Sequence, residues 1–394
     1  MNFLTILIAI LIFGGLIFIH ELGHYLTARL FDVHILEFAI GMGPKLLSKK
    51  SKKTGIVYSL RALPFGGFVS MVGEDDDGLL YENGDPASKG GAGSFSLPTD
   101  APVEEDTPKV KKEDPRALCR KPVWQRMIIM AAGGVMNILL GVVLAAVLVG
   151  SMEVIGGTMV GKFEENAISQ TQGLQVGDVI THVNGKTVYT HLDLSYAIAH
   201  DGHKPVELTV RRGAEIKRDD QGVIVSYKGG EEIVLKDITF GTEEAEGIVM
   251  GVQDFRPYQV QKTFGNVVMQ TFCYARLAIR QVWDGLTDLI IGRLGVEQMS
   301  GPVGVTQQIG QAASIGVTNL IFLVLVITMN LGVFNLLPIP ALDGGRLFFL
   351  FIELIFRKPI PRDLEARINF GFLALLMLFM LFITGKDILK MFVK

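Results

Sequence analysis

Four long stretches without a charged residue constrain what this chain can fold into more than any other feature. They cover residues 3–19, 128–152, 320–342 and 370–385. A helix needs about 20 apolar residues to cross the hydrocarbon core of a bilayer, so the first three runs qualify and the fourth is marginal. The runs therefore predict a polytopic α-helical membrane protein with about four transmembrane helices. A shorter stretch, 347–356, contains Glu353 and is expected to form a half-span or an interfacial helix.

Composition narrows the classes of partner. Charged residues make up 20% of the chain and the net charge is −3. A nucleic-acid binder needs a basic face to meet the phosphates, so we expect no nucleic-acid partner. The lipid bilayer is the first partner that the sequence implies.

Basic residues near the ends of the apolar runs predict the orientation. Lys and Arg gather at 45–61, 116–126 and 357–367, and such clusters favour the cytoplasmic side of a membrane. This pattern predicts that 31–125 and 357–367 are cytoplasmic. Both termini and the large segment between the second and third runs are then extracytoplasmic. Three lysines at the C-terminus argue weakly the other way, namely Lys386, Lys390 and Lys394.

The large segment between the second and third runs has the pattern of a small α/β domain. Residues 176–185 alternate apolar and polar side chains and end in an Asn-Gly turn signal. A short helix is expected at 192–199, and alternating strands follow at 206–213 and 232–235. This order resembles a bacterial PDZ domain, which binds an extended peptide at a sheet edge. A steric filter that binds nothing tightly is equally compatible. The histidines fit no metal spacing and are expected at the surface; they are His182, His191, His200 and His203.

The segment His20-Glu21-Leu22-Gly23-His24 is the sharpest chemical signal in the chain. Positions i and i+4 share one face of a helix, so both imidazoles can ligate one metal ion. Glu21 lies between them and can act as a general base. An ionisable cluster at the end of an apolar span is costly and usually functional, although polar contacts between helices are the alternative.

A catalytic zinc site needs a third protein ligand. The third apolar run offers one in the segment from Asn335 to Arg346, where two prolines break the helix and Asp343 precedes two glycines. Irregular backbone at membrane depth occurs only where protein or a water-filled cavity shields it. Asp343 as a simple helix cap and Asp343 as a metal ligand are both open at this point.

Together these segments resemble the site-2 intramembrane metalloproteases, and among them the bacterial RseP-like regulators of sigma-factor signalling. The resemblance rests on the His-Glu-x-x-His span, the Asn-x-x-Pro-x-Pro-x-Leu-Asp-Gly-Gly segment and the PDZ-like domain between them. Residues 38–44 and 58–69 look like the family's membrane-associated β-hairpin region, and 300–305 look like its Gly-Pro motif. The single PDZ-like unit differs from relatives that have two.

The resemblance implies the residues of the site. It assigns zinc to His20, His24 and Asp343, the general base to Glu21 and stabilisation of the substrate carbonyl to Asn335. A strand of the β-hairpin region would capture the unwound substrate; its residues are Phe65, Gly66, Gly67, Phe68 and Val69.

The resemblance also implies the substrates and the location. The substrates would be single-span membrane proteins, such as an anti-sigma factor or a signal-peptide remnant, pre-cleaved by another protease. The location would be the bacterial cytoplasmic membrane. Two other classes remain as alternatives: a non-catalytic PDZ scaffold, and an ion transporter, which would predict repeated broken spans where the sequence has one.

The expected organisation follows the chain in eight segments. They are a first transmembrane helix at 1–30, a cytoplasmic or re-entrant β region at 31–73, a flexible cytoplasmic loop at 74–115, a second transmembrane helix at 116–152, a PDZ-like domain at 153–240, an amphipathic region at 241–318, a third transmembrane helix at 319–356, and a cytoplasmic turn with a fourth transmembrane helix at 357–394.

Overall fold

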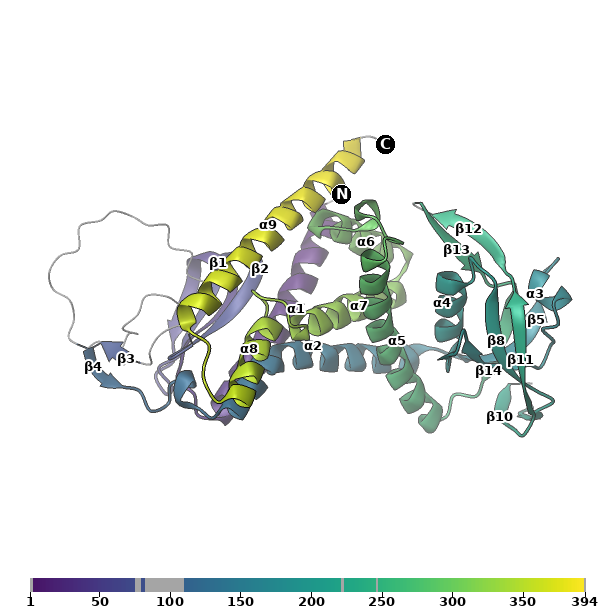
Figure 1. The fold of residues 1–394 in the computed structure, drawn as a ribbon, viewed down its shortest axis with the longest axis horizontal. Helices are drawn as coiled ribbons and strands as arrows, with labels where there is room; N and C mark the ends of the chain where they lie inside the picture. Colours follow the sequence, from purple (N-terminus) through teal and green to yellow (C-terminus); the bar gives the residue numbers. More distant parts are fainter. Residues whose placement is uncertain (1–2, 75–78, 82–109, 221–222, 246, 393–394) are drawn as a thin grey trace. The chain divides into compact units, whose positions relative to one another are not determined.

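The computed structural model describes residues 3–74, 79–81, 110–220, 223–245 and 247–392. The chain divides into two compact units (Figure 1). The first contains Met1–Leu140 and Ser300–Lys394, and the second contains Gly141–Met299. The loop predicted at 74–115 lies mostly outside the described residues; within it the structure describes a short hairpin of β3 (Leu79–Tyr81) and β4 (Val110–Glu113).

Four helices in the described part of the chain are long and apolar enough to cross a membrane, as predicted. They are α1 (Phe3–Leu30), α2 (Val123–Ser151), α7 (Val317–Leu336) and α9 (Arg362–Phe392). The helix α9 begins before its uncharged run because its first turns carry charged residues. Large apolar side chains along α9 remain exposed, including Phe370 and Leu378. A surface of this kind suits contact with lipid rather than with water.

Glycines allow the spanning helices of the first unit to approach closely. A Cβ added at Gly332 of α7 would lie 2.8 Å from the carbonyl oxygen of Gly134 in α2. A Cβ added at Gly23 of α1 would lie 2.7 Å from the carbonyl carbon of Ala132. Membrane helices pack through such small residues because lipid provides no hydrophobic drive for their association. These contacts hold α1 and α7 against the same helix, α2.

The β region consists of two long antiparallel strands, β1 (Ile35–Lys50) and β2 (Val57–Met71) (Figure 1). Both strands bend, so residues 37–40 pair with 57–60 on one side and with 67–70 on the other. Residues 57–60 also pair with 47–50. The result is a small β ribbon in which four strand segments lie side by side and 67–71 form an outer edge. Its apolar face packs on α1 and α2 through a shared core that includes Phe38, Val69 and Ile129.

The second unit is built around a mixed sheet. Its strand order is β11-β8-β6-β5-β14-β10-β9, and β7 pairs with β6. The strands are β5 (Ile155–Phe163), β6 (Val179–Val183), β7 (Lys186–Thr187), β8 (Val206–Arg212), β9 (Glu215–Arg218), β10 (Ile224–Lys228), β11 (Glu231–Ile238) and β14 (Phe255–Val260). A separate hairpin joins β12 (Gly241–Ala245) to β13 (Ile248–Val252). The strand β14 pairs antiparallel with β5 and lies beyond the predicted domain boundary at 240.

Two helices accompany this sheet in addition to the short α3 (Ile168–Thr171). The first is α4 (His191–Asp201), which begins with a capping box between Thr190 and Asp193. The second is α5 (Phe264–Ile290), a single helix within the region that the sequence predicts to be amphipathic. Residues Leu194 and Ile198 of α4 are fully buried in the main core of the unit.

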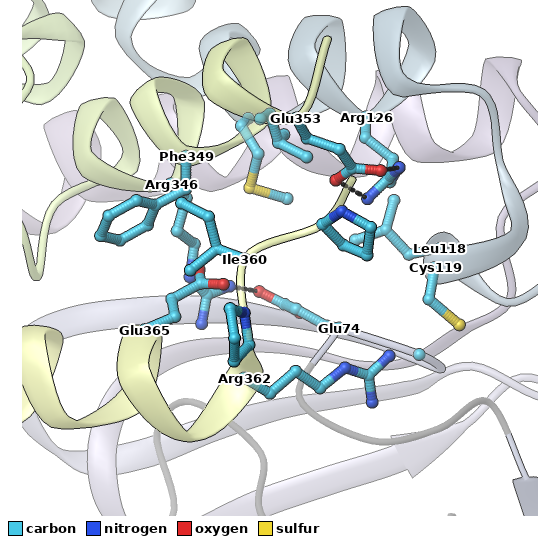
Figure 2. Close-up of a pocket in the computed structure, with 15 residues that line it drawn as sticks. Glu74, Leu118, Cys119, Arg126, Arg346, Phe349, Glu353, Ile360, Arg362 and Glu365 are labelled. Carbon is cyan, nitrogen blue, oxygen red and sulfur yellow. Dashed lines mark hydrogen bonds and ion pairs between the residues drawn. The ribbon is translucent and has the colours of Figure 1, made fainter. Parts of the chain in front are cut away.

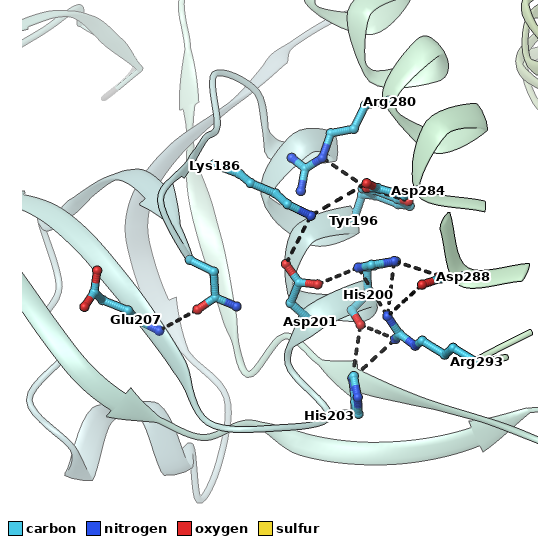
Figure 3. Close-up of polar contacts among 11 residues, drawn as sticks. Lys186, Tyr196, His200, Asp201, His203, Glu207, Arg280, Asp284, Asp288 and Arg293 are labelled. Carbon is cyan, nitrogen blue, oxygen red and sulfur yellow. Dashed lines mark hydrogen bonds and ion pairs between the residues drawn. The ribbon is translucent and has the colours of Figure 1, made fainter. Parts of the chain in front are cut away.

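A cluster of charged side chains joins α4 to α5 and the loop after it (Figure 3). His200 lies between two carboxylates, with Nδ1 2.5 Å from Asp201 and Nε2 2.9 Å from Asp288. Arg293 contacts both nitrogens of the same ring and the His200 carbonyl oxygen. His200 is therefore half-buried in an ion-pair network, whereas the sequence suggested a surface position.

The remaining helices complete the first unit. They are α6 (Pro302–Ile315), which starts directly after Gly301 of the Gly-Pro motif, and α8 (Asp343–Phe356). Residues 337–342 between α7 and α8 are not helical, which confirms the predicted break at the two prolines.

Candidate metal centre

Three of the predicted site residues meet between α1 and the start of α8. The Nε2 atoms of His20 and His24 lie 3.0 and 3.1 Å from Oδ2 of Asp343. The two Nε2 atoms are 3.3 Å apart. The histidines are one helical turn apart on α1, and Asp343 is the first residue of α8. One donor atom from each residue thus points to a common position, and the predicted grouping from distant segments is observed.

Helix α2 contacts both imidazole rings at their Nδ1 atoms, opposite the Nε2 atoms that face Asp343. The Nδ1–H of His24 donates a hydrogen bond of 2.8 Å to the carbonyl oxygen of Ile129. The Nδ1 atom of His20 lies 3.3 Å from the side-chain amide of Asn137, which is fully buried. Between these positions, a Cβ on Gly133 would lie only 2.6 Å from the His20 ring. A glycine is needed here because the rings lie directly against the helix backbone.

Glu21 is buried beside the three donors, with 8% of its surface exposed. Residue Gly67 of β2 lies next to it, since a Cβ at Gly67 would be 3.0 Å from Cγ of Glu21 and 3.0 Å from Cγ2 of Ile17. The outer edge of the β ribbon therefore runs past the carboxylate. Gly67 is one of the five residues predicted to bind substrate.

Asp343 is held in place by the irregular segment before it and by its own helix. Ala341 has a left-handed backbone with φ of 70°, and its N–H donates to Oδ1 of Asn369 in α9. A Cβ at Gly345 would lie 2.6 Å from the carbonyl oxygen of Ile339, so the chain folds back tightly over the first turn of α8. One turn beyond Asp343, Arg346 forms an ion pair with Glu74 after β2. These contacts fix the direction in which the carboxylate points.

A cavity of about 430 Å³ is lined by residues of α2, α8 and the start of α9, and the three donors are not among its lining residues (Figure 2). Two ion pairs form between residues that line the cavity, Glu74 with Arg346 and Arg126 with Glu353. Arg126 binds both carboxylate oxygens of Glu353, at 2.6 and 3.1 Å. Arg362, Glu365 and apolar side chains such as Phe349 also line the cavity. The lining contains three arginines and three glutamates, so its formal charges balance.

Asn335 lies in the last turn of α7, half-buried and eight positions before Asp343. Its assignment to the substrate carbonyl stays a prediction. Sequence analysis missed Asn137 and Asn369, although a signal was present for both. Each is an uncharged polar residue within or at the edge of an apolar run, and such residues usually have a partner on another helix.

Comparison with known proteins identifies the family. The model of peptidase family M50 matches residues 8–379. The chain belongs to this family. The match confirms the predicted relation to the site-2 proteases and the prediction that the chain is a metalloprotease.

Relatives of similar length support this M50 assignment. The regulator of sigma-W protease RasP of Bacillus subtilis is 32% identical over 98% of this chain and 99% of its own length. The zinc metalloprotease RasP of Bacillus licheniformis is 33% identical over 98% and 99%. The protein of the same name in Geobacillus kaustophilus is 30% identical over 98% of each chain.

Proposed function

We propose that this M50 peptidase is an intramembrane zinc metalloprotease, which hydrolyses peptide bonds within the transmembrane segments of single-span membrane proteins. The observation that carries the proposal is the convergence of His20, His24 and Asp343 with a buried Glu21 inside a bundle of membrane-spanning helices. Ionisable side chains at this depth are costly to bury, so such a cluster usually marks a functional site.

The donor set suits zinc. Two imidazole nitrogens and one carboxylate oxygen are ordinary zinc ligands, and catalytic zinc sites use three protein ligands with one open position. Their three donor atoms lie within 4.8 Å of one another. When bound there, a zinc ion supplies a Lewis acid that polarises a carbonyl and lowers the pKa of water to about 7. His20, His24 and Asp343 would hold the ion.

The chain's own residues would carry the proton and the charge. Glu21 acts first as the general base, which removes a proton from the attacking water, and then as the general acid, which delivers it to the leaving amine. Its burial keeps the carboxylate away from bulk water. Asn335 would donate a hydrogen bond to the substrate oxygen as negative charge develops on it.

The edge of the β ribbon is the proposed substrate-binding element. A transmembrane helix keeps its peptide bonds inside its own hydrogen bonds, so a substrate must unwind before it can be cut. Residues 67–71 pair with β1 on one side only among the described strands, and they run past Glu21. An unwound segment can add to such an edge as a further strand. The site would then include Phe65, Gly66, Gly67, Phe68 and Val69.

The substrate class and the location rest on the relatives. One of them is named a regulator of sigma-W, which supports an anti-sigma factor or a similar single-span protein as the substrate here, cut after prior cleavage by another protease. We infer a bacterial cytoplasmic membrane location, with the termini and the PDZ-like domain outside the cytoplasm. The sheet of the second unit, with its capped helix α4, supports a PDZ-like domain.

The proposal is tested by measuring zinc content and cleavage together. Purified protein in detergent should contain one zinc per chain and cut a single-span model substrate. Chelation should abolish cleavage, and added zinc should restore it. His24→Ala should lose both zinc and activity, whereas Glu165→Gln, an exposed acidic residue of the second unit, should keep both. Protein that binds no zinc and cuts nothing would favour the scaffold or the transporter.

A further inference from the structure

The side chain of Asn137 holds one of the two metal-facing imidazoles, and its geometry has a specific chemical requirement. Asn137 lies in the middle of α2, has no exposed surface, and places its amide 3.3 Å from Nδ1 of His20. The opposite nitrogen of that ring, Nε2, faces Asp343 at 3.0 Å. The His20 ring therefore has a contact on each nitrogen: Nε2 faces the proposed metal centre, and Nδ1 faces Asn137 of α2.

A neutral imidazole has one proton, which fixes what its partner has to do. If Nε2 is to bind a metal ion, its lone pair must be free and the proton must sit on Nδ1. The group that faces Nδ1 must then accept a hydrogen bond. An amide nitrogen facing Nδ1 would instead require the proton on Nε2, where it would block the ligand position.

The oxygen and nitrogen of an asparagine amide have nearly the same shape, so their placement is decided by the hydrogen bonds. With Nδ2 toward His20, the Oδ1 atom of Asn137 is buried and has no hydrogen-bond partner. A buried acceptor left in this state is costly. Turning the amide by half a rotation instead places Oδ1 beside Nδ1 of His20 and moves Nδ2 to the position that Oδ1 held. In this orientation Oδ1 accepts the hydrogen bond from Nδ1–H, which leaves the lone pair of Nε2 free for a metal ion.

The second histidine shows the same arrangement. Nδ1–H of His24 donates to the carbonyl oxygen of Ile129, and that residue is eight positions before Asn137 on α2. Eight residues are slightly more than two helical turns, so both acceptors lie on one face of α2, with Gly133 between them. Metal-binding histidines in proteins commonly give their second N–H to such an acceptor, which sets the tautomer and the ring orientation.

We propose that Asn137 is a positioning residue that accepts a hydrogen bond from Nδ1–H of His20 and thereby keeps Nε2 of that ring available to the metal. The inference rests on the proposed zinc site. The backbone carbonyl of Asn137 accepts a separate hydrogen bond of 3.1 Å from the hydroxyl of Thr328 in α7. This bond connects α2 to α7 without involving the Asn137 side chain.

The test measures zinc affinity of the full-length protein in detergent by competition with a chromophoric chelator, without any substrate. Asn137→Leu keeps the size of the side chain and removes the acceptor, so it should weaken zinc binding about ten- to a hundredfold. Asn137→Asp can still accept and should bind zinc as tightly as wild type or more tightly. Thr328→Val, the matched control, removes the other contact of Asn137 and should bind zinc within about twofold of wild type.

The outcomes separate this inference from the proposed function. Equal zinc affinities of Asn137→Leu and wild type would overturn the role of Asn137 and leave the zinc site standing. Zinc binding by Asn137→Asp that is as weak as that of Asn137→Leu would do the same. Wild type without zinc would overturn the zinc site itself, and this inference with it. If Asn137→Leu does not fold, Asn137→Asp decides alone: retained zinc affinity supports the role, and a loss beyond tenfold contradicts it.

Discussion

At the scale of single residues, the centre depends on how closely two imidazoles lie against the backbone of α2. The rings of His20 and His24 approach that helix where Gly133 has no side chain. Their Nε2 atoms then reach Asp343 from one side, while their Nδ1 atoms meet acceptors on α2. The positions of the two imidazole donors therefore depend on the absence of a side chain at Gly133.

Replacing Gly133 by alanine should disturb the centre directly. The new methyl group would lie 2.6 Å from Cε1 and 2.7 Å from Nε2 of His20, so the ring has to move. Overpacking of this kind costs about 1–3 kcal/mol, which corresponds to about a fivefold to 150-fold loss of zinc affinity. The measurement is chelator competition on purified protein.

Gly150→Ala is the matched control for this prediction. Gly150 lies on the same helix, and a Cβ there would meet nothing within 4 Å. Its zinc affinity should equal that of wild type. Tight zinc binding by the Gly133→Ala protein would show that the rings are not held as the structure has them.

At the scale of elements, buried acidic residues join helices that are far apart in the sequence. Asp387 of α9 is 6% exposed, and its Oδ2 accepts hydrogen bonds of 2.8 Å from the backbone N–H groups of Gly301 and Gly304. These N–H groups belong to the first turn of α6, which has no carbonyl partners for them within the helix. The carboxylate thus caps α6 from another helix.

Asp387→Ala should destabilise the contact between α6 and α9. Loss of a helix cap costs about 1–2 kcal/mol, so the thermal-unfolding midpoint in detergent should fall. Asp363→Ala changes an exposed acidic residue of the same helix and should shift stability by no more than about 0.5 kcal/mol. Equal midpoints for the two variants would argue against the capping role.

The charged cluster between α4 and α5 should make their contact depend on pH. The hydrogen bond to Asp201 raises the pKa of His200. Burial alone would raise the pKa of Asp201, but the hydrogen bond from His200 and the charge of Lys186 outweigh it, so this pKa is lowered. Asp288 and Arg293 contact the same imidazole and complete its surroundings.

The direction of the pH effect follows from these shifts. His200 stabilises the contact fully below its unfolded pKa of about 6.5, and this contribution is lost as the pH rises through its higher folded value. Asp201 contributes above about pH 4 and loses its contribution as the pH falls through its lower folded value. Hydrogen exchange of α4 and α5, corrected for intrinsic rates, should be faster at about pH 8 than at about pH 6. His200→Gln should remove the difference; slower exchange of wild type at the higher pH would contradict the assignment.

At the scale of the whole molecule, the orientation in the membrane is a prediction from charge. Lys52 and Lys228 are both exposed, the first in the β region and the second in the sheet of the other unit. In a protein without Cys119 and Cys273, Lys228→Cys should react with an impermeant maleimide on intact cells. Lys52→Cys should react only after the membrane is opened. The reverse pattern would invert the predicted topology.

The sequence predicts those parts of this molecule that local rules determine. Bilayer thickness dictates the length of an apolar helix, so α1, α2, α7 and α9 were visible as runs. Helical periodicity puts His20 and His24 on one face, and the two prolines mark the break before Asp343.

Contacts set by tertiary packing have no comparable local signal. The role of the Ile129 carbonyl depends on which face of α2 meets α1, and the sequence does not encode that face separately. The pairing of β14 with β5 joins segments about 100 residues apart, and the double pairing of residues 37–40 depends on bends in β1 and β2. Such pairings are chosen by the assembled fold rather than by the strand sequences.

The central claim is that Glu21 and the three converging donors cut a peptide bond at membrane depth. The most direct measurement is the intact mass of the products formed from a single-span substrate in liposomes, with wild type and Glu21→Gln compared at equal zinc content. Wild type should give fragments that end within the substrate's apolar span, and the variant should form them at a rate at least about a hundredfold lower. Fragments that end only outside the span, or equal cleavage by the variant, would contradict the account.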